Sequence, residues 1–162
     1  MKGLDAALRA LAAIAGQHRF DVLLIGHQPQ AHEIPEPLRG RVHATGWLDA
    51  RGVAEALHGC AAFLMPSRYE PFGLLALEAH AVMCPVIAAR TGGLCDIIIE
   101  NETGLFCAPD RLAEDIARHV GAVLRDNDLR EDLAHAAYAR LVEHYTIPRI
   151  CDQLELLYAA MA

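Results

Sequence analysis

The chain has 162 residues, of which 54% are hydrophobic, and a formal net charge of -7 at pH 7. Its isoelectric point is about 5.6 and its mean hydropathy is +0.20. The acidic balance and the scattered Lys and Arg argue against nucleic acid or an anionic membrane as a partner, and no apolar run reaches the roughly 18 to 20 residues that span a bilayer. We therefore expect one soluble, cytoplasmic domain with a packed core.

Helical and strand patterns alternate along the first half of the chain. Leu4, Leu8, Leu11 and Ala15 recur at helical spacing and predict a helix. The next patterns predict a strand over 20–25, a proline-rich loop over 27–40, a strand over 41–47, a helix over 49–58 that begins at a capping aspartate, and a strand over 61–66.

The second half continues the alternation and ends in helices. It predicts a helix over 72–82, a strand over 85–89, a glycine turn at 92–93, a short strand at 105–106, and helices over 111–124, 129–144 and 147–161. Such alternation predicts a parallel sheet covered by helices. Because an open α/β unit usually begins with a strand, whereas this chain begins with a helix, we expect the first strand to lie outside the chain.

Cysteine and histidine spacing excludes several kinds of site. The five cysteines are widely spaced and form no CxxC pair, and the nine histidines show no metal-ligand spacing. We expect buried free thiols and no metal. The cysteines are Cys60, Cys84, Cys95, Cys107 and Cys151. The glycine-rich motifs of NTPases and nicotinamide enzymes and the GxSxG motif of hydrolases are also absent from the sequence.

The most informative block is 66–78 (PSRYEPFGLLALE), which leaves a buried strand through a polar turn and enters a helix near Gly73. The free amides and the dipole of a helix N-terminus favour an anion there, and glycine lets a ligand approach the backbone. The carboxyl end of a parallel strand is also where open α/β sheets bind ligands. This block therefore predicts a phosphate-binding site.

Two carboxylates flank this helix start. Glu70 precedes the helix and Glu78 lies in its second turn, so both can face a ligand, and carboxylates suit hydroxyl recognition. A diphosphate beside two acids needs cations, for which Lys2 and Arg68 are the candidates. The alternative is that Glu70 caps the helix and Glu78 is solvated.

Further motifs follow this block in a fixed order. They are the Glu70-x7-Glu78 pair, the segment 85–88 (PVIA), the turn 90–94 (RTGGL) and the segment 101–104 (NETG). Together they resemble the C-terminal domain of glycogen and starch synthases and their group 1 glycosyltransferase relatives, the donor-binding half of the GT-B fold. The resemblance implies a Rossmann-like, three-layer α/β/α domain over residues 1–145 and a C-terminal helix over 146–162 that packs on the same domain.

The resemblance also implies a role for each matching residue. Glu70 would be the acid beside the transferred sugar, Lys2 would offset the charge of the leaving diphosphate, and Glu78 would bind the donor ribose. Backbone amides would come from Phe72, Gly73 and Leu74, and the distal phosphate and sugar would meet Thr91, Gly92 and Gly93. Trp47 would stack on the base, the alternative being a buried or interface tryptophan.

Parts of the family pattern are not found in this chain. The arginine that should pair with Lys2 is absent, and so is the N-terminal GT-B domain with the acceptor site. In the family the first strand sits in mid-sheet, so its loss would expose strand edges. We expect a domain that depends on a partner chain or self-associates through these edges.

The implied function is transfer of glucose, with retention of configuration, from ADP-glucose or UDP-glucose to an α-glucan. The reaction would require the other domain. It would need no cofactor and no metal. One alternative is a non-catalytic module that binds a nucleotide sugar or a partner chain. Another is a group 1 glycosyltransferase with a different sugar and acceptor.

Overall fold

The computed structural model describes residues 3–26 and 28–161. Its strands are β1 Val22–Ile25, β2 Val42–Gly46, β3 Phe63–Met65, β4 Val86–Ala89 and β5 Leu105–Cys107. Its α-helices are α1 Leu4–Ile14, α2 Ala50–His58, α3 Leu74–Ala81, α4 Leu94–Ile97, α5 Leu112–Arg125, α6 Asn127–His144 and α7 Ile147–Met161, and its 3₁₀ helices are η1 Ala31–Glu33, η2 Glu36–Leu38 and η3 Pro109–Arg111.

The strands form two parallel sheets. β1 pairs with β2, and β4 lies between β3 and β5. The predicted α/β fold with a parallel sheet is confirmed. Among the described residues no strand pairing joins β1 to β3, so the sheet is divided between these two strands.

The core has two sides, and the residues of β4 alternate between them. Ile87 and Ala89 pack with α1 and α5, whereas Val86 and Ala88 pack with α2, α3 and α4. All four are buried, as the two-residue period of a strand between two helix layers requires. The structure is therefore the expected three-layer α/β/α domain.

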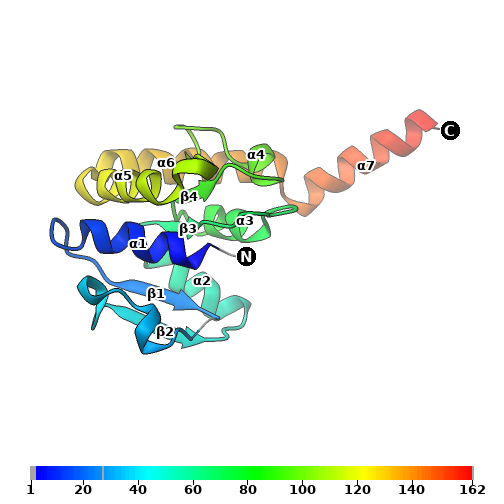
Figure 1. The fold of residues 1–162 in the computed structure, drawn as a ribbon. Helices are drawn as coiled ribbons and strands as arrows, with labels where there is room; N and C mark the ends of the chain where they lie inside the picture. Colours follow the sequence, from blue (N-terminus) through cyan, green and yellow to red (C-terminus); the bar gives the residue numbers. More distant parts are fainter. Residues whose placement is uncertain (1–2, 27, 162) are drawn as a thin grey trace.

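Helix α1 bridges the two sheets. Its N-terminal end lies against the residue that follows β3, because a Cβ atom placed on Gly3 would lie 2.0 Å from the carbonyl oxygen of Pro66. Its other end is held beside β2 by Arg41, whose Nη1 donates to the carbonyl of Ala15 at 2.9 Å. In Figure 1, α1 lies between β1 and β2 on one side and β3 and β4 on the other.

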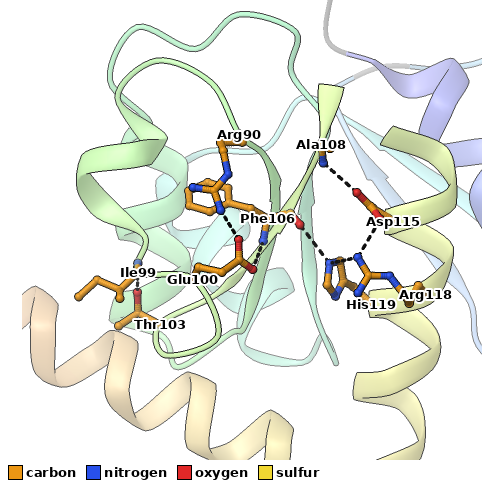
Figure 2. Close-up of polar contacts among 9 residues, drawn as sticks. All are labelled: Arg90, Ile99, Glu100, Thr103, Phe106, Ala108, Asp115, Arg118 and His119. Carbon is orange, nitrogen blue, oxygen red and sulfur yellow. Dashed lines mark hydrogen bonds and ion pairs between the residues drawn. The ribbon is translucent and has the colours of Figure 1, made fainter. Parts of the chain in front are cut away.

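A buried polar cluster fixes the carboxyl end of β5 (Figure 2). Oδ2 of Asp115 accepts from the amide of Ala108 at 2.9 Å, and Oδ1 accepts from Nη2 of Arg118 at 2.7 Å. Nε2 of His119 lies 3.0 Å from the carbonyl oxygen of Phe106. Helix α5 is thus attached to the strand by side chains as well as by apolar packing.

Glu100 holds the other side of the same strand. Its carboxylate accepts from the amide of Phe106 at 3.1 Å and forms an ion pair with Arg90. The guanidinium of Arg90 lies 4.3 Å from the centre of the Phe106 ring (Figure 2). The turn that follows β4 is therefore anchored to β5.

Helix α7 differs from the packing that its amphipathic pattern predicts. The helix spans Ile147–Met161, but none of its residues is buried. Figure 1 shows it extending away from the body of the domain. Its exposed apolar side chains include Ile147, Leu156 and Tyr158.

The prediction that the cysteines are buried is correct for only some of them. Cys84 and Cys107 are buried, and burial raises the pKa of each thiol to about 12. Cys60 is half-buried, whereas Cys95 in α4 and Cys151 in α7 are exposed. All five are free thiols.

Replacing Asp115 with Asn tests the buried cluster. Burial by itself raises the pKa of this carboxyl, but the Ala108 amide and the Arg118 guanidinium outweigh it, so the pKa lies below its ordinary value of 3.8. We expect Asp115→Asn to lower the free energy of unfolding by about 1 to 2 kcal/mol at pH 7, since a neutral acceptor replaces a charged one.

The loss of stability caused by Asp115→Asn should depend on pH. A carboxyl with a lowered folded pKa stabilises the fold above its unfolded pKa, and that stabilisation is lost as the pH falls below about 4. Urea unfolding between pH 7 and pH 3 should therefore show the difference between Asp115→Asn and the wild type shrinking as the pH falls. Glu114→Gln, an exposed change in the same helical turn, is the control and should have little effect.

Candidate functional site

Two backbone turns meet at the carboxyl ends of β3 and β4. The amide of Gly93 donates to the carbonyl of Glu70 at 3.0 Å. A Cβ atom placed on Gly92 would lie 2.0 Å from the Glu70 carbonyl oxygen, and one on Gly93 would lie 2.4 Å from that of Phe72. Only glycine permits this contact, so the predicted Thr-Gly-Gly turn and the predicted phosphate-binding block form one unit.

Gly73 determines where α3 begins. Its φ of 100° is not helical, so α3 starts at Leu74 and not at Phe72 as the sequence pattern predicts. A Cβ atom here would lie 2.8 Å from Cδ2 of Leu94, a residue of α4. The short helix α4, which the pattern does not predict, thus packs directly behind the helix start.

The first turn of α3 presents donors to the outside. The amide of Ala76 donates to the carbonyl of Gly73 at 2.9 Å, but the amides of Leu74 and Leu75 have no acceptor among the described residues. The N-cap residue is Gly73, which has no side chain to cap this terminus. Unpaired amides and the positive end of the helix dipole suit an anion at this position.

The two carboxylates lie on different parts of this unit. Glu70 belongs to the turn before α3 and is half-buried, because the Gly92–Gly93 turn packs on its backbone. Glu78 lies in the second turn of α3 and is exposed. The structure therefore gives Glu70 a fixed backbone and leaves the carboxylate of Glu78 open to a ligand.

Arginine side chains gather beside the unit around one carboxylate. Nη2 of Arg68 lies 3.4 Å from Oδ2 of Asp5, and Nη2 of Arg9 lies 3.5 Å from the same atom. These pairs are largely exposed, so they are weak and salt-sensitive. Lys2, the predicted catalytic cation, lies outside the described residues.

A cavity of about 490 Å³ opens at the same edge. Its lining combines residues of the two turns with the first turns of α1 and α5 and includes Arg9, Ser67, Arg68, Thr91 and Arg111. Sequence analysis finds Arg68 and Thr91 but gives no role to Ser67, although it lies in the block 66–78, and misses Arg9 and Arg111, which stand in no motif. The cavity lining does not include the side chains of Glu70, Phe72, Leu74 or Glu78.

Aromatic side chains around the edge are exposed. Trp47 follows β2 and is 82% exposed in the part of the chain that the structure describes. This exposure excludes the alternative that Trp47 is a buried tryptophan. Tyr69 and Phe72, in the turn before α3, are also exposed. The two strands that carry these turns, β2 and β3, belong to different sheets.

The part of the chain that the structure describes contains neither a candidate metal site nor a candidate membrane-spanning helix. No group of three or more His, Cys, Asp or Glu side chains is placed to hold a metal ion. No described helix has the length and apolarity needed to cross a membrane. The groups that the structure brings to the candidate site are the amides that begin α3, two carboxylates and the arginines that line the cavity.

Fold and site together define a Rossmann-like domain with a candidate anion site at the carboxyl edge of a parallel sheet. Residues 1–140 match the family described as Glycosyl transferases group 1, and the chain belongs to that family. This confirms the resemblance seen in the sequence motifs.

Several relatives are similar over most of the chain. Glycogen synthase of Mycobacterium tuberculosis is 33% identical over 165 residues, covering 98% of this chain and 40% of that protein. D-inositol 3-phosphate glycosyltransferase of Acidothermus cellulolyticus is 32% identical, covering 90% of this chain and 35% of that protein. The chain therefore spans about two fifths of the length of such relatives.

Solved structures show the same fold. Sucrose-phosphate synthase from Thermosynechococcus elongatus superposes with a TM-score of 0.83 at 30% identity, over 99% of this chain and 42% of that chain. The C-terminal domain of a glycosyl transferase group 1 family protein from Francisella tularensis has a TM-score of 0.76 at 24% identity, over 90% of this chain and 80% of that one. The domain thus corresponds to the C-terminal half of the GT-B fold.

Replacing Gly93 with Ala tests the contact between the two turns. The backbone of Gly93 has an ordinary φ of -63°, so the new Cβ atom acts only through its overlap with the carbonyl of Phe72. We expect a loss of about 1 to 3 kcal/mol in urea unfolding and faster exchange of the residue 93 amide.

Gly16→Ala is the matched control for this variant. A Cβ atom at Gly16 meets no heavy atom within 4 Å, so the substitution should be neutral or stabilising. Equal stability of the Gly93→Ala and Gly16→Ala proteins would contradict the contact.

Proposed function

We propose that this domain binds the nucleotide-sugar donor of a retaining glycosyltransferase. The observation that carries the proposal is the contact of the Gly92–Gly93 turn with Glu70, which fixes a carboxylate-bearing turn next to the open N-terminus of α3. Relatives that act on sugars, such as glycogen synthase, cover nearly the whole chain. HepE, which was solved in complex with UDP, has a TM-score of 0.85 at 21% identity.

Different residues of the site would bind the phosphates, the ribose and the sugar of the donor. The amides of Leu74 and Leu75 would bind phosphate oxygens, and the exposed carboxylate of Glu78 would accept hydrogen bonds from ribose hydroxyls. Glu70 would lie beside the transferred sugar, where its fixed backbone limits reorganisation as charge develops. Lys2 would neutralise the leaving diphosphate, a role implied by the family resemblance.

For the particular donor and acceptor, we favour transfer of glucose from ADP-glucose or UDP-glucose to an α-glucan. The similarity to a glycogen synthase supports this choice. A group 1 enzyme with another sugar and acceptor is the second candidate, favoured by the comparable identity to D-inositol 3-phosphate glycosyltransferase. The acceptor would bind to the N-terminal half of a GT-B enzyme, and closure of the two halves would exclude water.

A non-catalytic role is the remaining alternative. Because the chain spans only about two fifths of its relatives, it would bind a nucleotide sugar without transferring it unless an acceptor-binding half is present. We propose a cytoplasmic location and neither a cofactor nor a metal for the reaction, with the amides of α3 and the basic side chains in place of a metal ion.

Calorimetric titration with ADP, UDP, ADP-glucose and UDP-glucose tests the donor site and identifies the base. We expect saturable binding that Glu78→Ala weakens by about tenfold or more, since a charged hydrogen-bond acceptor is removed. Glu131→Ala, an exposed change on α6, is the control and should leave the affinity unchanged. Absence of binding by the folded chain would favour a need for the other half, or a non-catalytic module that binds a partner chain in place of a nucleotide sugar.

Trp47 provides an independent optical test of base stacking. It is the sole tryptophan and is largely exposed, so a base stacked on it should quench its fluorescence. We expect quenching by nucleotides but not by glucose 1-phosphate, which has no base. We further expect Trp47→Ala to weaken nucleotide binding by about two- to tenfold; unchanged affinity in this variant would exclude the stacking role.

A further inference from the structure

The cavity of about 490 Å³ is lined by groups that the proposed donor site does not use. It opens between the first turns of α1 and α5 and the turns that follow β3 and β4, and its apolar lining includes Ala6, Ala89 and Leu112. The amides that begin α3 and the carboxylates of Glu70 and Glu78 are not part of this lining. Pockets for small molecules usually have volumes of roughly 300 to 1,000 Å³. The cavity is therefore large enough to hold a small molecule beside the donor site.

Ser67 is a buried polar residue in the lining of this cavity. It is only 4% exposed, and its hydroxyl group has no hydrogen-bond partner among the described residues. Buried hydroxyl groups are normally paired, because an unpaired one has lost its hydrogen bonds to water without replacing them. An oxygen atom of a ligand in the cavity would supply the missing partner.

Two arginines of the lining are held around one carboxylate. Nη2 of Arg68 and Nη2 of Arg9 lie 3.4 Å and 3.5 Å from the same oxygen atom, Oδ2 of Asp5. The three side chains are largely exposed, so these ion pairs are weak and can be exchanged for others. A phosphate group carries more charge and more acceptor oxygens than a carboxylate, so it would compete with Asp5 for both guanidinium groups.

Arg111 brings a third positive charge to the same cavity. It is exposed, and it has no ion pair or hydrogen bond among the described residues. It directly precedes α5, so its charge comes from a different element than the charges of Arg9 and Arg68. Three guanidinium groups thus line one cavity in a chain whose net charge is -7.

Two carboxylates belong to the lining as well. Asp110 lies in η3 and Glu114 in the first turn of α5, and both are exposed and without a partner among the described residues. Carboxylates repel a phosphate group but accept hydrogen bonds from hydroxyl groups. The lining therefore suits a molecule with a phosphate group at one end and hydroxyl groups at the other.

We propose that this cavity binds a small phosphate monoester that carries hydroxyl groups, such as the phosphate of a polyol or a sugar. The phosphate group lies against Ser67, Arg9 and Arg68, in the place that the carboxylate of Asp5 takes in the free protein. Arg111 approaches the phosphate from the start of α5, and the two carboxylates of the lining accept hydrogen bonds from the hydroxyl groups. The proposal does not rest on the proposed function.

Titration of the wild-type chain with glycerol 3-phosphate, followed through the amide signals in NMR, tests the proposal. We expect saturable shifts centred on residues 67, 91 and 111, and no binding of glycerol, which lacks the phosphate group. Inorganic phosphate should bind about threefold or more weakly, since it lacks the hydroxyl groups. No saturable binding, shifts centred on the amides of Leu74 and Leu75, or equal affinity for inorganic phosphate would each overturn the proposal.

Substitutions in the lining give changes of opposite sign. Arg111→Ala should weaken glycerol 3-phosphate binding by about tenfold and Ser67→Ala by about threefold or more, because each removes a donor to the phosphate. Asp5→Asn should strengthen it by about threefold or more, because the competing carboxylate is removed. Arg39→Ala, the loss of an exposed arginine that has no ion pair among the described residues, is the control. Unchanged affinity in both Arg111→Ala and Asp5→Asn would contradict the proposal.

Nucleotides distinguish this cavity from the donor site. If UDP displaces glycerol 3-phosphate, or if Glu78→Ala abolishes its binding, the cavity is part of the donor site and the proposal is wrong. Binding of glycerol 3-phosphate together with UDP would support it. Binding of glycerol 3-phosphate to a chain that binds no nucleotide would also support it, while the proposed function would fail its own test.

Discussion

The contact between the Gly92–Gly93 turn and the backbone of residues 70–72 determines the geometry of the whole candidate site. Two carbonyl oxygens, those of Glu70 and Phe72, occupy the space where side chains of residues 92 and 93 would be. The contact positions the turn before α3, and this turn fixes the position of the N-terminus of α3. A site made largely of backbone groups needs such a constraint, because no side-chain rotamer can correct a displaced amide.

The strand β4 and its neighbour β5 hold the Gly92–Gly93 turn in place. The alternating burial of β4 fixes the register of the strand that leads to the Thr-Gly-Gly turn. Glu100 binds both the Phe106 amide and Arg90, so the segment after β4 cannot move independently of β5. Asp115 and His119 then attach β5 to α5. Rigid elements thus position a site that lies on turns, the usual arrangement in α/β proteins.

The sequence predicts the features that depend on local pattern. Asp49 caps α2 with a 2.8 Å bond to the amide of Gly52, as its position before an amphipathic segment predicts. The helices and strands lie where their periodicities indicate, because each pattern reflects which faces are buried. The unpredicted short helix α4 is one exception. The start of α3 is another, since the left-handed backbone of Gly73 overrides the helical pattern that begins at Phe72.

Features that depend on long-range contacts could not be predicted in this way. Arg9 and Arg111 join Arg68 around the cavity only because α1 and α5 both start at the same edge. The exposure of α7 could not be predicted from its periodicity either. An amphipathic pattern shows that a helix has an apolar face but does not show what covers that face. Motifs identify the candidate site residues on the turns, Arg68 included, whereas Arg9 and Arg111 are identified only by the fold.

The charges around the candidate site limit how it can hold a diphosphate. The chain carries a net charge of -7, and Glu70 and Glu78 lie next to the position proposed for phosphate. The helix dipole supplies only about half a positive charge, and Arg9 and Arg68 are already paired with the same carboxylate of Asp5. A diphosphate must therefore compete with Asp5 for these arginines or meet cations from elsewhere. Lys2, to which the family resemblance gives this role, would be one such cation.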